Sequence, residues 1–417
     1  MLFRSGSKHH PNYPPFKITA QEAALLRAQL DDPHAVPDLS SITDNNRRAR
    51  IEQEIRAWCG YRGQEFFRTA RGIIYQHDAF RNLAQICFPK ESGEVIDNMV
   101  DKKYHMLVAY SFYKGDGKDL ETAAIDTMLA MYRGMEATYF NKTSTLQKLV
   151  RAKRDPLTGN VIMSGTTDSP ETIEVSEIKF AYDSFVGEPK PSAQNAAMRF
   201  VETEIGQNID INQDGYFEEW LKAPNATQEF NDLDVDIVGV PERIYTADWG
   251  WQGWTNAFSD RSFVRPVQRF LALGGVRMHY GHPDYFRVSS AKWRGGISSP
   301  STVNEDIIAG YDINLSGRKI IYREYMQAGK AREYVYTKAT GLFTKFGMGA
   351  GQQATKRQLA ELHTFFSTFG ILRGFTHFVG ALGFYFRKPL LEKAMVFYAF
   401  SVMFLGASLF GTFPAEA

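Results

Sequence analysis

Side chains that can bind a cation gather in the middle of the chain. The segment 210–215 reads DINQDG and follows the opening of a calcium-binding loop, in which oxygen ligands alternate and a glycine makes the turn. The twelfth position of such a loop needs a bidentate carboxylate, and this chain carries Leu221 there. We therefore interpret Asp210 as a carboxylate at the end of a strand, followed by a helix that begins near Tyr216.

A second acidic segment is the run Asp232, Asp234 and Asp236. Paired carboxylates could hold Mg²⁺ or Mn²⁺ on a nucleotide diphosphate. The nearby Pro224 and Asn231 are more typical of a polar loop at the surface. We favour the solvated loop, and we predict no dedicated metal site.

Glycines near the carboxyl-terminal end offer a third kind of chemistry. Gly347, Gly349 and Gly351 follow Lys345, so backbone amides could approach a phosphate group while the lysine supplies a positive charge. The segment lacks the Gly-x-Gly-x-x-Gly spacing of dinucleotide-binding loops, and by itself it does not establish a phosphate site.

These side chains need a folded scaffold, and hydrophobic periodicity predicts one that mixes helices and strands. A strand, a helix and a second strand at 106–140 should form a βαβ unit. A later helix, capped by Asp260, should bury Phe263, Val267 and Phe270. The class is α/β with an open sheet and functional loops at strand ends. The other expected elements are a helix at 64–80, strands at 106–112 and 136–140 around a helix at 120–131, a hairpin at 145–152 and 161–163, strands at 173–185, 197–201 and 319–326, and a loop at 248–253.

Composition limits the class of protein. The chain has 417 residues, of which 44% are hydrophobic and 23% charged, and this balance is typical of a globular protein. Its formal net charge of +1 argues against a nucleic-acid-binding protein, because neutralising phosphates needs an excess of lysine and arginine. Cys59 and Cys87 cannot form a disulfide framework or a cysteine-rich zinc site, which favours a reducing compartment.

Three regions are expected along the chain. Residues 1–40 lack periodicity and contain several prolines, so we predict a flexible arm without a secretory signal. Residues 41–373 should form one large cytosolic domain. Residues 374–417 should form an interfacial helix and a membrane-spanning segment, because 394–413 carries no charge and reaches the ~20 residues that a spanning helix needs. Basic residues before this segment favour a cytosolic location for the large domain.

Several motifs in the second half of the chain occur in a fixed order. They are RMHYGHPD at 277–284, RGG at 294–296, NEDI at 304–307 and QAGKAR at 327–332. With these motifs, the chain from about residue 62 to its end resembles the catalytic region of β-1,3-glucan (callose) synthases, the membrane-bound transferases of glycosyltransferase family 48. The resemblance is specific, because it rests on several ordered motifs over most of the chain.

The resemblance implies a GT-A-like (Rossmann-like) glycosyltransferase domain that transfers glucose from UDP-glucose, with inversion, to the 3-hydroxyl of a growing β-1,3-glucan. It implies a multi-pass protein of the plasma membrane with this domain facing the cytosol. The implied partners are further membrane-spanning segments of a longer synthase complex and a small GTPase regulatory subunit. Inverting transfer needs a carboxylate base for the acceptor hydroxyl and positive charge for the departing diphosphate. Lysines are expected to supply that charge, with Mg²⁺ as the alternative.

The resemblance also implies roles for particular residues. Glu305 or Asp306 would be the base, since this adjacent pair resembles the acceptor-side acidic motif of processive sugar transferases, and the sequence does not decide between them. Lys190 and Asp210 match a family lysine and aspartate around the donor site. Lys345 matches a lysine near the diphosphate. The remaining substrate-binding candidates are Asn195, Gln327, Lys330 and Arg332.

The chain also departs from the family pattern near these positions. Residues 193–196 read AQNA where the family has Asn-Gln-Asn-His, and Ala331 replaces the second glycine of the 327–332 motif. Each lost hydrogen bond to a charged donor could weaken binding by about 1.5 to 3 kcal/mol. An alternative function is therefore a catalytically silent fragment or divergent paralogue that binds a nucleotide sugar, a glucan or a full-length synthase. A third possible function is a membrane-tethered calcium-binding module, which only the segment 210–215 supports.

In the 277–284 motif we expect His279, His282 and Asp284 to be structural.

Overall fold

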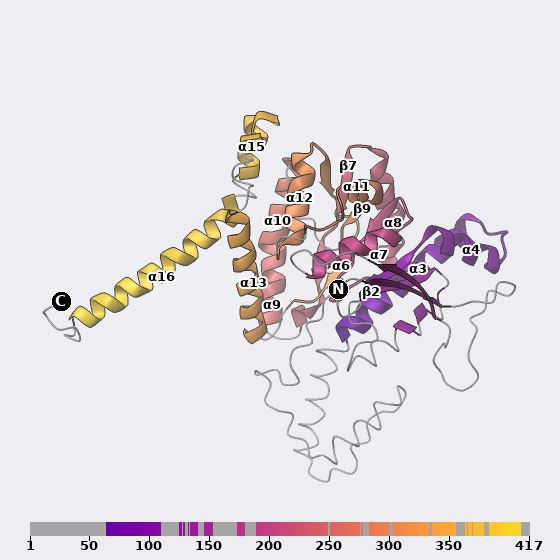
Figure 1. Ribbon diagram of the computed structural model, residues 1–417, viewed down its shortest axis with the longest axis horizontal. Helices are drawn as coiled ribbons and strands as arrows, with labels where there is room; N and C mark the ends of the chain where they lie inside the picture. Colours follow the sequence, from indigo (N-terminus) through magenta and orange to yellow (C-terminus); the bar gives the residue numbers. More distant parts are fainter. Residues whose placement is uncertain are drawn as a thin grey trace, which may run out of the picture.

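The computed structural model is an α/β molecule with a long helix that extends from its body (Figure 1). Strands in the described residues form two sheets of four strands and one of three, which confirms the expected α/β class. The structure describes residues 64–109, 125–126, 128–129, 132, 134–140, 146–152, 173–179, 189–248, 251–275, 277, 283–299, 303–332, 336–355, 363–364, 366–368, 370–378 and 383–409.

The first sheet contains the parallel strand pair of the predicted βαβ unit. Strands β1 (Met106–Ala109) and β2 (Met135–Phe140) are parallel neighbours, which confirms that prediction for the two strands. β2 pairs antiparallel with β3 (Leu146–Ala152), and β3 pairs antiparallel with β4 (Ile173–Lys179). The order β1-β2-β3-β4 therefore combines a parallel pair with an antiparallel extension.

Helix α3 (Gln64–Cys87) packs on this sheet. The helix predicted over 64–80 is confirmed, and it continues for two further turns. Ile73 and Ile74 of α3 contact a buried core that includes Met106, Met135 and Val150 of the sheet. Helix α4 (Gly93–Lys103) follows α3 and is capped by Ser92, whose hydroxyl accepts a hydrogen bond from the backbone of Val95.

The second sheet is mixed and has the order β10-β7-β9-β5. β10 (Lys319–Tyr322) and β7 (Val235–Gly239) are parallel, whereas β9 (Tyr285–Arg287) is antiparallel to β7 and to β5 (Ile205–Gln207). β10 begins where the strand at 319–326 was predicted and ends earlier. A core shared with helices α11 (Val288–Trp293) and α12 (Glu305–Leu315) fixes both helices to this sheet. Its buried side chains are Met198, Ile237, Phe286, Val288, Ala291, Ile297, Ile313 and Ile320.

The third sheet brings together three segments that are far apart in the sequence. β11 (Ala328–Lys330) is antiparallel to β6 (Gln213–Asp214) and parallel to β8 (Glu242–Ile244). Gly329 permits this pairing, because a Cβ atom there would collide with Oδ1 of Asp214. The remaining short elements are η2 (Met198–Phe200), α7 (Phe217–Trp220), α8 (Ala223–Gln228), η3 (Glu229–Asn231) and η4 (Tyr245–Asp248).

The strand predicted at 197–201 is wrong. Helix α6 (Pro189–Ala197) occupies the preceding residues and runs directly into η2. Proline is tolerated in the first turn of a helix, and the alanines that follow favour helix over strand. The apolar run at 197–201 therefore continues a helix instead of starting a strand.

The buried side predicted for residues 260–270 is also wrong. Helix α9 (Trp251–Ser259), the π-helical turn η5 (Asp260–Val264) and helix α10 (Arg265–Leu273) follow one another without a break, so Asp260 caps no helix and α9 occupies part of the predicted loop at 248–253. A π turn inserts an extra residue and changes which side chains face inward. Phe263 and Phe270 are consequently more than half exposed, while Leu271 is buried.

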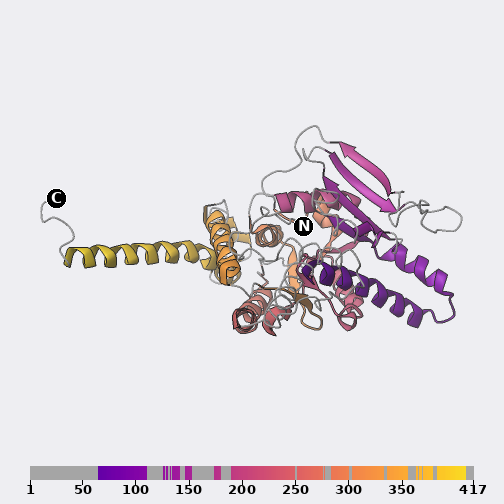
Figure 2. The ribbon, with the colours of Figure 1, turned by 90° about the horizontal axis from the view of Figure 1, so that it is seen from below.

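Helices α13 (Tyr336–Thr355), α15 (Ile371–His377) and α16 (Gly383–Leu409) end the described chain. α16 extends away from the body in both views (Figures 1 and 2). Gly347, Gly349 and Gly351 lie within α13 and form no phosphate-binding loop. Their backbone amides are engaged in a helix and cannot cradle a phosphate group.

The expected membrane-spanning helix at 394–413 is not found. Among the described residues, each helix is too short or too polar to cross a bilayer. α16 begins at Gly383, and its first half includes charged residues. Other predictions lie outside the described residues, namely the arm at 1–40, most of the helix at 120–131, the strand at 161–163, and His279 and His282.

Candidate functional site

Two lysines and two carboxylates from four separate elements meet in what we call the lysine–carboxylate cluster. Lys190 Nζ lies 3.1 Å from Oδ1 of Asp210 and 2.9 Å from Oε1 of Glu305. Lys330 Nζ lies 2.9 Å from Oδ2 of Asp210. Asp210 therefore binds both lysines, and Lys190 connects the two carboxylates. The structure thus brings together four of the residues singled out in the sequence.

Each member of the cluster stands near the end of an element. Lys190 lies in the first turn of α6, Asp210 follows β5, Glu305 opens α12 and Lys330 ends β11. Ligand sites in α/β proteins form at such edges of a sheet, where loops and helix ends meet. The amino-terminal end of α12 also carries partial positive charge, which favours the acids in its first turn.

Lys190 is a permanent positive charge in this site. Burial by itself lowers the pKa of its ammonium group, but the carboxylates of Asp210 and Glu305 outweigh burial and raise the pKa above the ordinary value. The lysine is therefore protonated throughout the physiological range of pH.

Asp306 differs from its neighbour Glu305. Burial, together with the charge of Glu305, raises the pKa of Asp306 to about 7, although Lys190 and a hydrogen bond of 2.9 Å from the backbone of Ile307 oppose this rise. Glu305 is bound directly by Lys190, whereas Asp306 can exchange a proton near neutral pH. The two adjacent acids are therefore suited to different tasks.

Glu242 of β8 is a member of the site that was not predicted from the sequence. Its Oε1 accepts a hydrogen bond from Gln213 Nε2 and lies 3.6 Å from Lys330 Nζ, and its Oε2 accepts a hydrogen bond of 3.1 Å from Arg332 Nη2. Arg332 is thus joined to the cluster through Glu242 and Lys330. One feature of the sequence indicates Glu242: it is an acid that follows the buried strand β7 closely. Ligand sites of α/β proteins form at the carboxyl ends of such strands.

Asn195 holds the loop that leads into α12. Its Oδ1 accepts hydrogen bonds from the backbone amides of Ile297 and Ser298, at 2.9 and 3.0 Å, and its Nδ2 donates one of 2.7 Å to the carbonyl of Ser298. A Cβ atom at Gly296 would collide with this side chain. Asn195 stays a predicted substrate-binding residue, and the structure gives it a second task as an anchor.

We expect Asn195→Ala to lower the free energy of unfolding by about 2 kcal/mol or more, because it removes three hydrogen bonds and leaves partly buried backbone groups without a partner. Urea unfolding measures this change. Asn225→Ala is the matched control, since Asn225 is exposed in α8, and it should change the free energy by less than about 0.5 kcal/mol. Equal small changes in the two variants would contradict the anchoring role.

In the described structure, two candidates take no part in the ion pairs of the cluster. Gln327 is fixed through its backbone, whose N–H donates a hydrogen bond of 2.9 Å to Oε2 of Glu219. Lys345 is exposed on α13, one turn before Gly349. A Cβ atom at Gly349 would collide with Asn304, so α13 packs against the start of α12. Lys345 therefore belongs to the helix that covers the acidic end of α12.

The acidic run at 232–236 is divided between surface and interior. Asp232 and Asp234 are exposed and pair with Lys319, at 3.1 and 3.4 Å, so the solvated-loop interpretation is confirmed for them. It is wrong for Asp236, which lies in β7, is fully buried and accepts hydrogen bonds from two arginines and a serine. This cationic setting does not fit Mg²⁺. Within the part of the chain that the structure describes, no three His, Cys, Asp or Glu side chains are grouped as a metal site requires.

The described part of the RMHYGHPD motif is structural. Asp284 is buried and forms an ion pair of 2.9 Å with Arg277, which is buried as well. Its other oxygen accepts a hydrogen bond of 3.1 Å from the backbone of Val240. The hydrogen bond from Val240 ties the motif to the end of β7, and the buried ion pair confirms the structural interpretation of Asp284.

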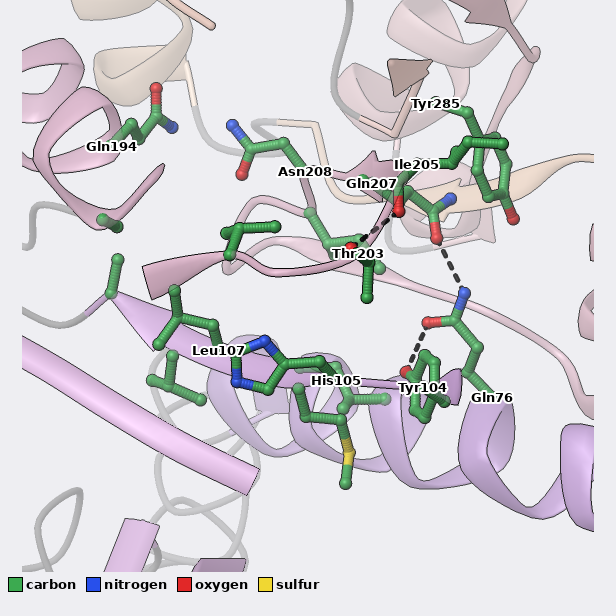
Figure 3. A pocket seen from close by; sticks show the side chains of 18 of the residues that line it. Gln76, Tyr104, His105, Leu107, Gln194, Thr203, Ile205, Gln207, Asn208 and Tyr285 are labelled. Atoms are coloured by element: carbon green, nitrogen blue, oxygen red, sulfur yellow. Dashed lines mark hydrogen bonds between the residues drawn. The ribbon is translucent and has the colours of Figure 1, made fainter. Parts of the chain in front are cut away.

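A cavity of about 290 Å³ opens between β1 and the segment 203–211 (Figure 3). Its wall is mainly apolar and includes Leu107, and Asp210 of the cluster forms part of its lining. At one end, Gln76 accepts a hydrogen bond of 2.7 Å from the hydroxyl of Tyr104 and donates one of 2.8 Å to Oε1 of Gln207. An apolar cavity with a few fixed polar groups is typical of a site for a small ring-containing ligand.

The chain is similar to known proteins over most of its length. A family described as "1,3-beta-glucan synthase component" matches residues 36–411. Callose synthase 7 of Arabidopsis thaliana is 29% identical over 391 residues, which cover 85% of this chain and 19% of that protein. Callose synthase 12 of Arabidopsis thaliana is 30% identical over 417 residues, which cover 88% of this chain and 23% of that protein. The chain thus spans about a fifth of the length of these relatives.

Similarity to solved structures is much smaller. A mannosyltransferase from Pyrobaculum calidifontis, solved with GDP-mannose and Mn²⁺, aligns at a TM-score of 0.34 with 14% identity, over 56% of this chain and 61% of that chain. This likeness is too small to establish a common fold. The family match, by contrast, covers well over half of the sequence and includes every member of the lysine–carboxylate cluster. The chain therefore belongs to the 1,3-beta-glucan synthase family.

Proposed function

We propose that this chain is a glycosyltransferase catalytic region with a GT-A-like domain at 41–373. It transfers glucose from UDP-glucose, with inversion, to the 3-hydroxyl of a growing β-1,3-glucan. The observation that carries the proposal is the lysine–carboxylate cluster next to an apolar cavity, in a chain of the 1,3-beta-glucan synthase family. Inverting transfer requires a base and a cationic site for the leaving group, and the cluster contains both kinds of group.

Lys190 and Lys330 are the cations that stabilise the departing diphosphate. Both are at least partly buried, so their charges act through a medium less polar than water and are stronger than those of surface lysines. Asp210 and Glu242 hold the two ammonium groups in place before the donor binds. A positioned charge lowers the barrier without a cost of rearrangement during the reaction.

Asp306 is the base. It takes the proton from the acceptor 3-hydroxyl while the hydroxyl oxygen attacks carbon 1 of glucose. The bond between carbon 1 and the diphosphate oxygen breaks, and UDP leaves with the electron pair. Asp306 is favoured over Glu305 because its pKa of about 7 makes it the stronger base at neutral pH, whereas Glu305 is occupied by Lys190.

The cavity beside β1 is the site for the uracil and ribose rings of the donor. It shares Asp210 with the cluster, so a nucleoside there has its diphosphate near Lys190 and Lys330. We expect Leu107→Trp to weaken UDP binding by at least about tenfold, because the larger ring fills the cavity. Val95→Trp, at an exposed position of α4, should leave UDP affinity unchanged. Titration calorimetry compares the two variants, and equal affinities would exclude this cavity as the nucleoside site.

The proposal extends to the place and partners of the chain. Since the chain covers about a fifth of its relatives, we propose that it works at the plasma membrane with further segments of a longer synthase and with a small GTPase regulatory subunit. The decisive experiment supplies labelled UDP-glucose to the membrane fraction of cells that express the chain, and measures label in polymer that β-1,3-glucanase removes. Background incorporation by the wild type would contradict the transfer, whereas UDP binding without turnover would favour a silent, nucleotide-sugar-binding paralogue.

A further inference from the structure

Elements α9, η5 and α10 follow one another along the body (Figure 1), and they expose large apolar side chains. We call this set of side chains the aromatic ridge. It is unusual because a soluble helix normally buries such residues. Trp251 and Leu273, at its two ends, are 78% and 83% exposed. The members of the ridge are Trp251, Trp254, Phe258, Phe263, Val264, Phe270 and Leu273.

Three rings at the beginning of the ridge stack on one another. Trp251 stacks on Trp254 with a centroid distance of 5.1 Å, and Trp254 stacks on Phe258 at 5.3 Å. Stacking fixes the rings in one orientation while they remain exposed, so the ridge is an ordered apolar surface. Tryptophan and phenylalanine on one side of a helix are typical of segments that lie in the interface of a bilayer.

Charges around the ridge favour an anionic surface as its partner. Residues 251–273 contain three arginines and a single acid, Asp260. Asp260 is buried and lies 3.6 Å from Arg265, and Arg269 pairs with Glu324. Arg261 is exposed at the side of the ridge. No acid of the helix itself is exposed, and the exposed Glu324 beside it is paired with Arg269, so anionic headgroups would meet little repulsion.

The ridge continues onto a second helix. Arg373 of α15 donates a hydrogen bond of 2.7 Å to the carbonyl of Gly275, which holds α15 next to the end of α10. α15 buries Gly374 and His377, and the His377 ring lies 5.3 Å from that of Tyr311. Its opposite side exposes apolar residues, namely Ile371, Leu372 and Phe375. Two helices from distant parts of the sequence therefore present apolar side chains at one edge of the body.

We propose that the aromatic ridge and the exposed side of α15 form a docking face for a lipid surface with anionic headgroups. A lipid surface is extended and adaptable, and so it can cover two helices that carry no matching groove between them. The face would orient the body on the membrane. This inference rests on the proposed membrane location, but it does not depend on sugar transfer.

The test must report on the ridge itself, because α16 also exposes apolar side chains and can bind vesicles. In a Cys59→Ser, Cys87→Ser background of the full chain, we place a single labelled cysteine by Phe258→Cys or Leu273→Cys. Val95→Cys, exposed on α4, is the control. The probe is an environment-sensitive fluorophore, and the vesicles contain phosphatidylcholine, phosphatidylserine and a lipid whose acyl chain carries a quencher.

We expect the vesicles to quench the label at 258 and 273 by at least about twofold and to leave the label at 95 unchanged. Vesicles without phosphatidylserine should quench less. Quenching that is equal at all three positions would overturn the proposal. The proposal would also be overturned if, without vesicles, the fluorescence of the label at 258 reported burial as the protein concentration rises. That result would assign the ridge to a contact between copies of the chain.

A double variant, Trp254→Ser with Phe258→Ser, is combined with the label at 273. The phosphatidylserine vesicles should quench this label at least about twofold less than in the parent chain, because the variant lacks two aromatic anchors. UDP affinity, measured in parallel, reports whether the variant is folded and whether the proposed donor site is intact. Unchanged quenching at 273 with unchanged UDP affinity would overturn the docking face alone, whereas a missing UDP signal in the wild type would contradict only the proposed function.

Discussion

Asp306→Asn is expected to reduce glucosyl transfer from UDP-glucose by about 10²- to 10⁴-fold, the range by which a positioned general base accelerates proton transfer. The amide keeps the size of the side chain and its place in the first turn of α12, but it cannot take a proton from the acceptor. Labelled polymer formed per unit of protein measures the loss. UDP affinity should be nearly unchanged, because the leaving group is held by lysines.

Glu305→Gln is the matched control for Asp306→Asn. It removes a partner of Lys190, so it should weaken UDP binding and lower stability, and it should not abolish the pH dependence of transfer. If Glu305→Gln lost transfer completely while Asp306→Asn kept it, the roles of the two acids would be the reverse of those proposed.

The pH dependence of transfer gives an independent check on Asp306. Since the pKa of Asp306 is raised to about 7, transfer should increase as the pH rises towards about 7 and then level off. Stability should change in the opposite direction. Between the ordinary value of 3.8 and about 7, the folded state keeps a proton that the unfolded chain has released, so the free energy of unfolding falls as the pH rises. In Asp306→Asn, the free energy of unfolding should decrease less between pH 5 and pH 8 than in the wild type. Unfolding measurements at these two pH values would detect the difference.

Lys190→Met is expected to affect both stability and donor binding. The substitution keeps most of the aliphatic stem but leaves Asp210 and Glu305 without their shared cation. Breaking a buried ion pair from one side costs about 3 kcal/mol or more, because a charge remains buried without compensation. The side chain of Glu305 is only 7% exposed, so solvent screens little of this loss. We expect a clear fall in the unfolding temperature and loss of measurable UDP binding.

Lys345→Met is the control for Lys190→Met, since Lys345 is exposed on α13. Its removal should leave the unfolding temperature nearly unchanged. A second comparison joins Lys190→Met with Asp210→Asn. If the two lysines and Asp210 act as one network, the double variant should be less destabilised than the sum of the single variants. Additive effects would show that the ion pairs do not contribute as a unit.

Local patterns in the sequence predicted much of the scaffold. The helix at 64–80 and the parallel strands β1 and β2 are where periodicity indicated, because their apolar side chains repeat with the spacing of one buried face. The prediction of a strand at 197–201 was wrong for a local reason, because a short apolar run does not distinguish a strand from a buried helix. The prediction of the buried side of α10 was wrong because a π turn precedes this helix and changes which of its residues face inward.

By itself, the sequence determined the family through its ordered motifs, and it identified four residues that meet in one cluster. Only the tertiary structure decided what each residue does there. Glu305 and Asp306 are adjacent acids, but Lys190, which is more than a hundred positions away, pairs with Glu305, whereas burial and the charge of Glu305 raise the pKa of Asp306. Glu242 and Asp236 gained their roles from cations on distant strands and loops. The physical reason is that burial and charge depend on segments brought together by folding, whereas a sequence pattern describes only neighbours along the chain.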